Sequence, residues 1–131
     1  MKKNIIITDK APAPIGPYNQ AVSYNGLLFI SGQIPLNPAT GNMVTDSIEA
    51  ETKQVMDNLQ AILTEAGMDF PHVMKTTIFL TDMNDFPKVN EVYGAYFPEG
   101  EAPARETVQV SRLPKDSRVE ISMIAVDTKE V

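Results

Sequence analysis

The stretch RVEISMIAV, residues 118–126, constrains the fold more than any other part of the chain. Read as a β-strand, it has one wholly apolar face: Val119, Ile121, Met123 and Ala125. Glu120 lies on the opposite face, which also carries Ile124 and Val126. A strand that is apolar on both faces is covered on each side. Because an unpaired carboxylate is costly to desolvate there, Glu120 needs a partner or a function.

Turn signals and hydrophobic periodicity divide the rest of the chain into strands and helices. Asn25-Gly26 is typical of a type I′ hairpin turn, because both residues accept a positive φ. β-Prone runs predict strands at 3–8, on both sides of that turn within 20–31, and at 72–81, 105–111 and 118–127. The sequence therefore predicts three strands before the first helix and three after it.

Two amphipathic helices are predicted between these strands. An apolar stripe indicates a helix from Asp46 to Ala66, with Asp46 and Glu49 as a capping box and Gly67 at its end. The second helix has Pro87 in its first turn and ends before Pro98. Its predicted apolar face consists of Phe86, Val89, Tyr93, Tyr96 and Phe97.

This order of elements predicts a single α+β domain over residues 1–131, with a mixed sheet. Each helix has only one apolar face, so both helices are expected to pack on the same face of the sheet. The other face also carries apolar side chains, and no element remains to cover it. We therefore expect a partner chain on that face.

Composition excludes several classes of site. The chain has no cysteine and a single histidine, His72, which excludes a thiol nucleophile and cysteine- or multi-histidine zinc sites. We expect no metal and no cofactor. The net charge of −6 argues against nucleic-acid binding. The chain shows no secretory signal and no apolar run long enough to span a membrane, so a cytoplasmic location is expected.

Arg105 is the candidate ligand-binding cation among three arginines. Arg112 and Arg118 flank the turn LPKDS and are most simply solvated turn residues. Arg105 follows Pro103-Ala104 at the mouth of a strand, and its planar guanidinium matches a carboxylate through two parallel hydrogen bonds. The alternative is a structural salt bridge to an acid of the same chain.

Glu120 has the same two interpretations, as an ion-pair member or as a functional acid. A simple hairpin about Pro114-Lys115 would place Arg105 opposite Ile124, offset from Glu120 by about 13 Å along the strand. That distance is long for a direct salt bridge. A small ligand between the two groups, or partners from different chains, explains the spacing better.

Four further positions are candidates with simple structural alternatives. Tyr18 lies on a proline-rich loop, where it could cover a pocket or pack on the surface. Ser31 and Gly32 could cap and permit a turn, or Gly32 could allow close approach of a ligand. Asn90 could be an ordinary helix residue. No G-x-S-x-G motif surrounds Ser31, so a serine hydrolase is not expected.

Three segments resemble the Rid family, formerly called YjgF, in its RidA branch of reactive enamine/imine deaminases. They are APAPIGPYNQAV, LLFISGQIPLNPATG and PARETVQVSRLPKDSRVEISMIA, and the resemblance extends from Ile5 to Ala125. It implies a chorismate-mutase-like α+β fold that assembles as a homotrimer with ligand clefts between subunits. It also implies hydrolysis of 2-aminoacrylate and 2-aminocrotonate, through their imines, to 2-oxo acids and ammonia.

The resemblance also implies roles for individual residues. Arg105 matches the arginine that holds the substrate carboxylate, and Glu120 matches the acid that positions water. The cleft-lining positions match Tyr18, Ser31, Gly32 and Asn90. Thr107 stands where many members have cysteine, and Glu106 where a small residue is usual; alternation points Glu106 away from Arg105. Two rival functions stay open: a non-catalytic trimer that binds 2-oxo or amino acids, and RNA cleavage.

Overall fold

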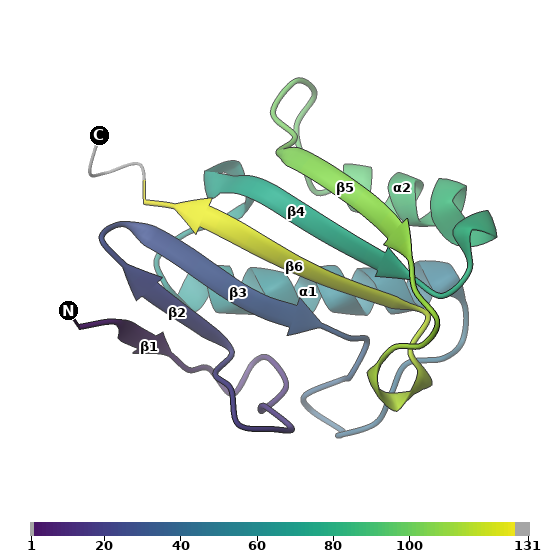
Figure 1. Cartoon of the computed structure of the whole chain (residues 1–131), viewed down its shortest axis with the longest axis horizontal. Helices are drawn as coiled ribbons and strands as arrows, with labels where there is room; N and C mark the ends of the chain where they lie inside the picture. Colours follow the sequence, from purple (N-terminus) through teal and green to yellow (C-terminus); the bar gives the residue numbers. More distant parts are fainter. Residues whose placement is uncertain (1, 128–131) are drawn as a thin grey trace.

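The computed structural model describes residues 2–127 and has the predicted order of elements (Figure 1). Its first half contains strands β1 (Asn4–Ile6), β2 (Ala21–Tyr24) and β3 (Leu27–Gln33), followed by helix α1 (Ile48–Glu65). Its second half contains β4 (Val73–Leu80), α2 (Phe86–Gly94), β5 (Ala104–Gln109) and β6 (Val119–Val126). Short 3₁₀ turns at Phe70–His72, Met83–Asp85 and Pro114–Asp116 connect these elements.

The strands form one six-stranded mixed sheet in the order β1-β2-β3-β6-β4-β5. β6 pairs antiparallel with both β3 and β4, which places this apolar strand in the centre of the sheet. β5 pairs only with β4, in parallel, and has no fully buried residue. The predicted hairpin between β5 and β6 is therefore wrong. The apolar β4 takes the place beside β6, and the polar segment ARETVQ is left at the edge of the sheet.

The hairpin turn between β2 and β3 has the predicted chemistry. Asn25 and Gly26 have φ values of 53° and 83°, which suit a type I′ turn. The resulting register pairs Val22 with Phe29 and Tyr24 with Leu27. The turn therefore determines which side chains of β2 and β3 share a face.

The N-cap of helix α1 lies one residue later than predicted. Ser47, not Asp46, is the N-cap, and its hydroxyl accepts a hydrogen bond from the Ala50 backbone N–H at 3.0 Å. The Asp46–Glu49 capping box is therefore wrong. Gly67 follows the helix with φ 76°, as expected of the residue after a helix end.

Helix α2 is shorter than its apolar pattern indicated. It begins at Phe86 with Pro87 in the first turn, as predicted, and ends at Gly94. Tyr96 and Phe97 therefore lie beyond the helix, although Phe97 still packs against Tyr93 with ring centroids 4.9 Å apart. Aromatic packing therefore keeps the turn after α2 on the helix-covered face of the sheet.

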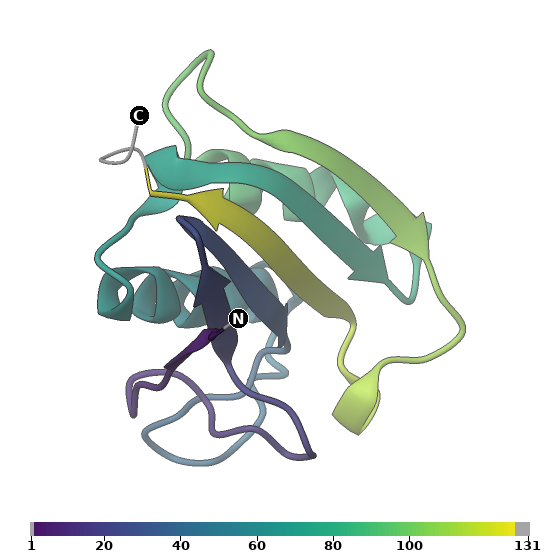
Figure 2. The same ribbon diagram turned by 60° about the vertical axis from the view of Figure 1, so that its left-hand side comes forward.

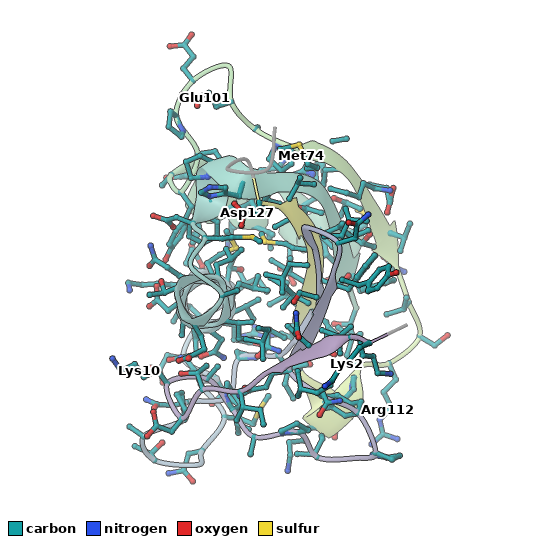
Figure 3. All side chains as sticks on the ribbon, turned by 90° about the vertical axis from the view of Figure 1, so that its left-hand side faces the viewer. Lys2, Lys10, Met74, Glu101, Arg112 and Asp127 are labelled. Carbon is teal, nitrogen blue, oxygen red and sulfur yellow. The ribbon has the colours of Figure 1, made fainter. Side chains whose placement is uncertain are left out.

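Both helices cover one face of the sheet, as predicted, and the main core lies beneath them (Figures 1 and 2). Figure 3 views α1 end-on and shows side chains filling the space between this helix and the strands. The largest fully buried side chains come from α1 and the central strands: Leu28, Met56, Leu59, Ile62, Leu63, Ile78, Leu80 and Ile121. No helix within residues 2–127 is long and apolar enough to cross a membrane.

Within residues 2–127, no helix lies over the opposite face of the sheet, as predicted. Register places Phe29 and Val22 on this open face, where they adjoin Ile124 of β6 and Ile5 of β1. Phe29 is 42% exposed, and Ile5 and Leu27 are exposed as well. An apolar surface formed by several neighbouring strands is typical of a protein–protein interface.

Candidate active site

Glu120 lies in a pocket at the edge of the open face. The pocket has a volume of about 350 Å³. Its lining residues come from the N-terminal loop, the end of β3 and the segment before β6: Ile15, Tyr18, Ser31, Gly32, Ile34, Pro114 and Glu120. The fold thus brings four of the predicted site residues together, although they are separated by up to a hundred positions in sequence.

Gly32 permits this position of the Glu120 side chain. The pairing of β3 with β6 shifts register between Ile30 and Gln33, and Gly32 lies within this irregularity. A Cβ atom at Gly32 would lie 2.6 Å from Glu120 Oε2 and 2.8 Å from its Cδ. Gly32 therefore allows a close approach, as one prediction held, but the group that approaches is the Glu120 side chain of the same protein.

Burial raises the pKa of the Glu120 carboxyl above its usual value. Within residues 2–127, no cation forms an ion pair with this carboxylate. The structure therefore gives no support to the alternative that Glu120 is an ion-pair member within one chain. A half-buried carboxylate with a raised pKa is a stronger base than an exposed one.

Hydrogen bonds attach the N-terminal loop to the end of β3. The Ser31 hydroxyl donates to the Asn19 carbonyl at 2.6 Å, and the Ser31 N–H donates to the Gln20 carbonyl at 2.9 Å. The Tyr18 hydroxyl accepts from the Ile15 N–H at 3.3 Å. These bonds place Tyr18 and Ser31 in one pocket.

Gln20, which was not among the predicted site residues, stabilises the same N-terminal loop through side-chain hydrogen bonds. Its side chain is 3% exposed, accepts from the Thr8 N–H, and donates to the carbonyls of Thr8, Ala11 and Pro12. A buried amide with its hydrogen bonds satisfied rigidifies its surroundings. A lone glutamine in a loop offers no sequence signal for this role.

Arg105 lies in a second pocket, between β5 and α2. This pocket has a volume of about 480 Å³, and its lining residues are Asn90, Tyr93, Gly94, Ala102, Pro103 and Arg105. The loop before β5 projects from the body of the protein, with Glu101 near its tip (Figure 3). Asn90 thus lies in the same pocket as Arg105 rather than with Tyr18, Ser31 and Gly32, and neither Asn90 nor Arg105 lines the Glu120 pocket.

Two aromatic rings of α2 contact the Arg105 guanidinium. Its Cζ atom lies 5.5 Å from the centroid of Phe86 and 5.1 Å from that of Tyr93. No acidic side chain within residues 2–127 forms an ion pair with Arg105. The alternative of a structural salt bridge is therefore not met, and the hydrogen-bonding fork is available to a ligand.

Buried polar atoms without hydrogen-bond partners gather around Arg105. In the described part of the chain they are Thr76 Oγ1, Asn90 Oδ1, the Tyr93 hydroxyl and Thr107 Oγ1. Thr76 is the register partner of Arg105, and Thr107 lies two residues farther along β5 on the same face. Such groups mark sites where a ligand or water completes the hydrogen bonding.

Glu106 points away from Arg105, as alternation predicted. It accepts from the Thr77 hydroxyl at 2.5 Å and forms an ion pair with Lys75 at 3.1 Å. The Thr77 hydroxyl and Lys75 lower the pKa of Glu106. Glu106 therefore does not compete for the Arg105 fork.

One arginine prediction was wrong. Arg112 forms an exposed pair with Asp116, but Arg118 pairs with Glu51 of α1, which is 2% exposed. Glu51 also accepts from the Arg118 backbone N–H at 3.1 Å. Arg118 therefore attaches the start of β6 to α1. The sequence did not indicate that Glu51 would pair with Arg118, because acidic residues are common in the first turn of a helix.

The Arg105 and Glu120 pockets share no lining residue. Arg105 lies over α2, on the helix-covered face, whereas Glu120 alternates with Val119 and Ile121, which are buried beneath the helices. The two groups therefore occupy opposite faces of the sheet. Within one chain, the two groups therefore do not face a common pocket.

Metal ligands do not cluster in either pocket. Residues 2–127 contain no group of three histidine, cysteine, aspartate or glutamate side chains able to hold a metal ion. The polar atoms that are available are a guanidinium, a carboxylate, hydroxyls and an amide. This set suits recognition of a small polar organic molecule.

Comparisons with known proteins identify the family of the chain. Residues 8–127 match the family described as Endoribonuclease L-PSP. A mouse protein named 2-iminobutanoate/2-iminopropanoate deaminase is 52% identical over 95% of this chain and 91% of its own length. The crystal structure of the Rid family protein YyfA from Yersinia pestis has a TM-score of 0.93 and 49% identity, covering 95% of this chain and 99% of that one.

The chain belongs to the Rid (YjgF) family. A further similar structure is E. coli TdcF with bound serine, which has a TM-score of 0.88 and 45% identity and covers 94% of this chain and 98% of that one. The resemblance stated from sequence motifs is thus confirmed for family and fold. This Rid protein therefore presents its two candidate groups on the fold of a relative, TdcF, whose structure contains bound serine.

Proposed function

We propose that this Rid protein hydrolyses 2-imino acids, formed from 2-aminoacrylate and 2-aminocrotonate, to 2-oxo acids and ammonia. The observation that carries the proposal is the pair of unpaired charged groups, Arg105 and Glu120, each in an incomplete pocket. The name of the mouse relative, 2-iminobutanoate/2-iminopropanoate deaminase, supports the same reaction class.

The active assembly in this proposal is a homotrimer. The exposed apolar face of the sheet, with Phe29 and Leu27, supplies the contact surface between copies. Closed cyclic assembly presents one face of a copy to a different surface of the next. It can therefore bring the Arg105 pocket of one copy against the Glu120 pocket of its neighbour.

Arg105 binds the substrate carboxylate in this mechanism. Its planar fork forms two parallel N–H···O bonds and so fixes the plane of the conjugated imine. Tyr18 and Ser31 line the opposite side of the cleft, and Asn90 and Thr107 lie on the Arg105 side. Positioning of the reactants supplies part of the rate enhancement.

Glu120 acts as the general base for water. The water oxygen attacks C2 of the imine while a water proton passes to the Glu120 carboxylate, which yields a tetrahedral carbinolamine. Glu120 returns this proton to the nitrogen, which completes the neutral carbinolamine. Glu120 then takes the proton of the C2 hydroxyl and passes it to the nitrogen as the C–N bond breaks, so that ammonia leaves and the C2 hydroxyl becomes the carbonyl of the 2-oxo acid. One general base contributes about 10²–10⁴-fold, which suffices for a reaction that already proceeds in water.

A coupled assay tests the activity. Threonine dehydratase generates the enamine, and its decay is followed with and without the protein. We expect faster decay with wild-type protein, loss of turnover in Arg105→Ala with the assembly intact, and retained carboxylate binding without turnover in Glu120→Gln. Unchanged decay in the presence of wild-type protein would contradict the proposal. It would favour the non-catalytic binding function instead.

Mixing the two inactive variants tests whether the site is shared. If each site takes Arg105 from one copy and Glu120 from the next, a mixed trimer of Arg105→Ala and Glu120→Gln chains contains one intact site. Random mixing in equal amounts makes about three quarters of the trimers mixed, and each mixed trimer has one intact site out of three. About a quarter of wild-type activity should therefore return. No recovery in verified mixed trimers would show that both residues act from the same chain.

A further inference from the structure

Arg105 is held by aromatic rings, and no acid shares in holding it. Its guanidinium carbon lies within 5.5 Å of the Phe86 centroid and within 5.1 Å of the Tyr93 centroid. The ion pairs within residues 2–127 involve Lys53, Lys75, Arg112 and Arg118, and none involves Arg105. Fully buried arginines, by contrast, are almost always paired.

This difference has a chemical consequence for carboxylate binding. An acid that held Arg105 would accept the same N–H groups that a substrate carboxylate needs. Aromatic faces attract the cation through the ring quadrupole and accept none of those hydrogen bonds. Two rings can therefore restrict the guanidinium while its fork stays unoccupied.

The two rings are themselves fixed by the fold. Phe86 is the first residue of α2, directly before Pro87, and it packs against the core. Tyr93 is 4% exposed and packs against Phe97 at 4.9 Å. Burial raises the pKa of Tyr93, and the nearby Arg105 and Thr76 lower it only in part, so this ring stays neutral. Neither ring can neutralise the arginine.

We propose that Phe86 and Tyr93 are positioning residues that hold the Arg105 fork ready for a substrate carboxylate. This inference rests on the proposed function for its substrate, 2-iminobutanoate. The rings act before the ligand arrives, by removing side-chain freedom that binding would otherwise have to remove. Ordering one long side chain on binding weakens affinity by about threefold to tenfold.

Binding of 2-oxobutanoate, measured by calorimetry, tests this role independently of turnover. We expect Phe86→Leu to raise the Kd about threefold to tenfold and to raise KM similarly with little change in kcat. Phe86→Tyr keeps a ring and should restore both values.

Phe70→Leu is the matched control, because Phe70 packs in the same aromatic cluster, against Tyr96 and Phe97, and the rings over Arg105 are those of Phe86 and Tyr93. Both leucine variants should lower Tm, but only Phe86→Leu should weaken binding. Equal Kd values for Phe86→Leu and wild type, or equal weakening in Phe70→Leu, would overturn the proposal. If wild type binds 2-oxobutanoate but does not accelerate imine decay, the proposed reaction fails while the Kd comparison still decides the role of the rings.

Discussion

Substitution of Gly32 by alanine is a direct test of how Glu120 is positioned. A Cβ atom at this position would lie 2.6 Å from Oε2, 2.8 Å from Cδ and 3.0 Å from Cγ of Glu120. All three atoms belong to a flexible side chain, so Glu120 can move while the backbone of β3 stays in place. The substitution therefore acts mainly on the carboxylate.

The size of the displacement follows from these distances. Ordinary van der Waals contact begins near 3.4 Å, so the carboxylate must retreat by about 0.8 Å. Misplacement of a catalytic group by about 1 Å can lower the rate about a hundredfold. We expect kcat to fall about tenfold to a hundredfold. Stability should change little, because alanine favours a strand over glycine by about 0.5–1 kcal/mol, which offsets the cost of moving the Glu120 side chain.

The assay is imine hydrolysis at saturating and limiting substrate, together with thermal unfolding. KM should stay near the wild-type value, since Arg105 binds the carboxylate in the other pocket. In a Glu120→Gln background, Gly32→Ala should cause no further loss of kcat. A folded Gly32→Ala protein with wild-type kcat, or an equal loss in both backgrounds, would refute the reasoning.

Three further predictions concern the pH profile, the fold and the assembly. Burial raises the pKa of Glu120, and a general base must be ionised. We therefore expect kcat/KM to reach its maximum above this pKa and to fall as the pH drops through it, at a higher pH than for an exposed glutamate. A pH profile unchanged by Glu120→Gln would contradict this. Glu51→Ala should lower the free energy of unfolding in urea by about 2 kcal/mol, because Arg118 loses a buried charged acceptor. Phe29→Lys should shift the sedimentation coefficient toward a monomer, because it places a charge on the exposed apolar face; an intact oligomer would show that this face is not the contact surface.

Local patterns predicted the secondary structure well, because their causes are local. The Asn25-Gly26 turn needs only residues that accept a positive φ, and both adopt it. The α1 stripe needs only the helical repeat, and Leu59, Ile62 and Leu63 are all buried. Where two capping residues adjoin, local signals do not discriminate, and Ser47 rather than Asp46 caps the helix.

The candidate site was predictable in its residues and only partly in its geometry. Motifs identified Arg105 and Glu120, and the fold leaves both without an ion-pair partner in the described part of the chain. The hairpin that set their spacing was wrong, because β4 lies between β5 and β6. Strand order depends on competition between distant segments for the centre of the sheet, which no short window of sequence contains.

The type and order of the helices and strands and the chemistry of the hairpin turn were determined by the sequence alone, since periodicity and turn chemistry act over a few residues. Tertiary structure alone decided that Arg105 rests on Phe86 and Tyr93, and that Gly32 makes room for Glu120. It also decided that the cation and the carboxylate lie on opposite faces of the sheet, because strand order and a register shift assign each side chain to its surface.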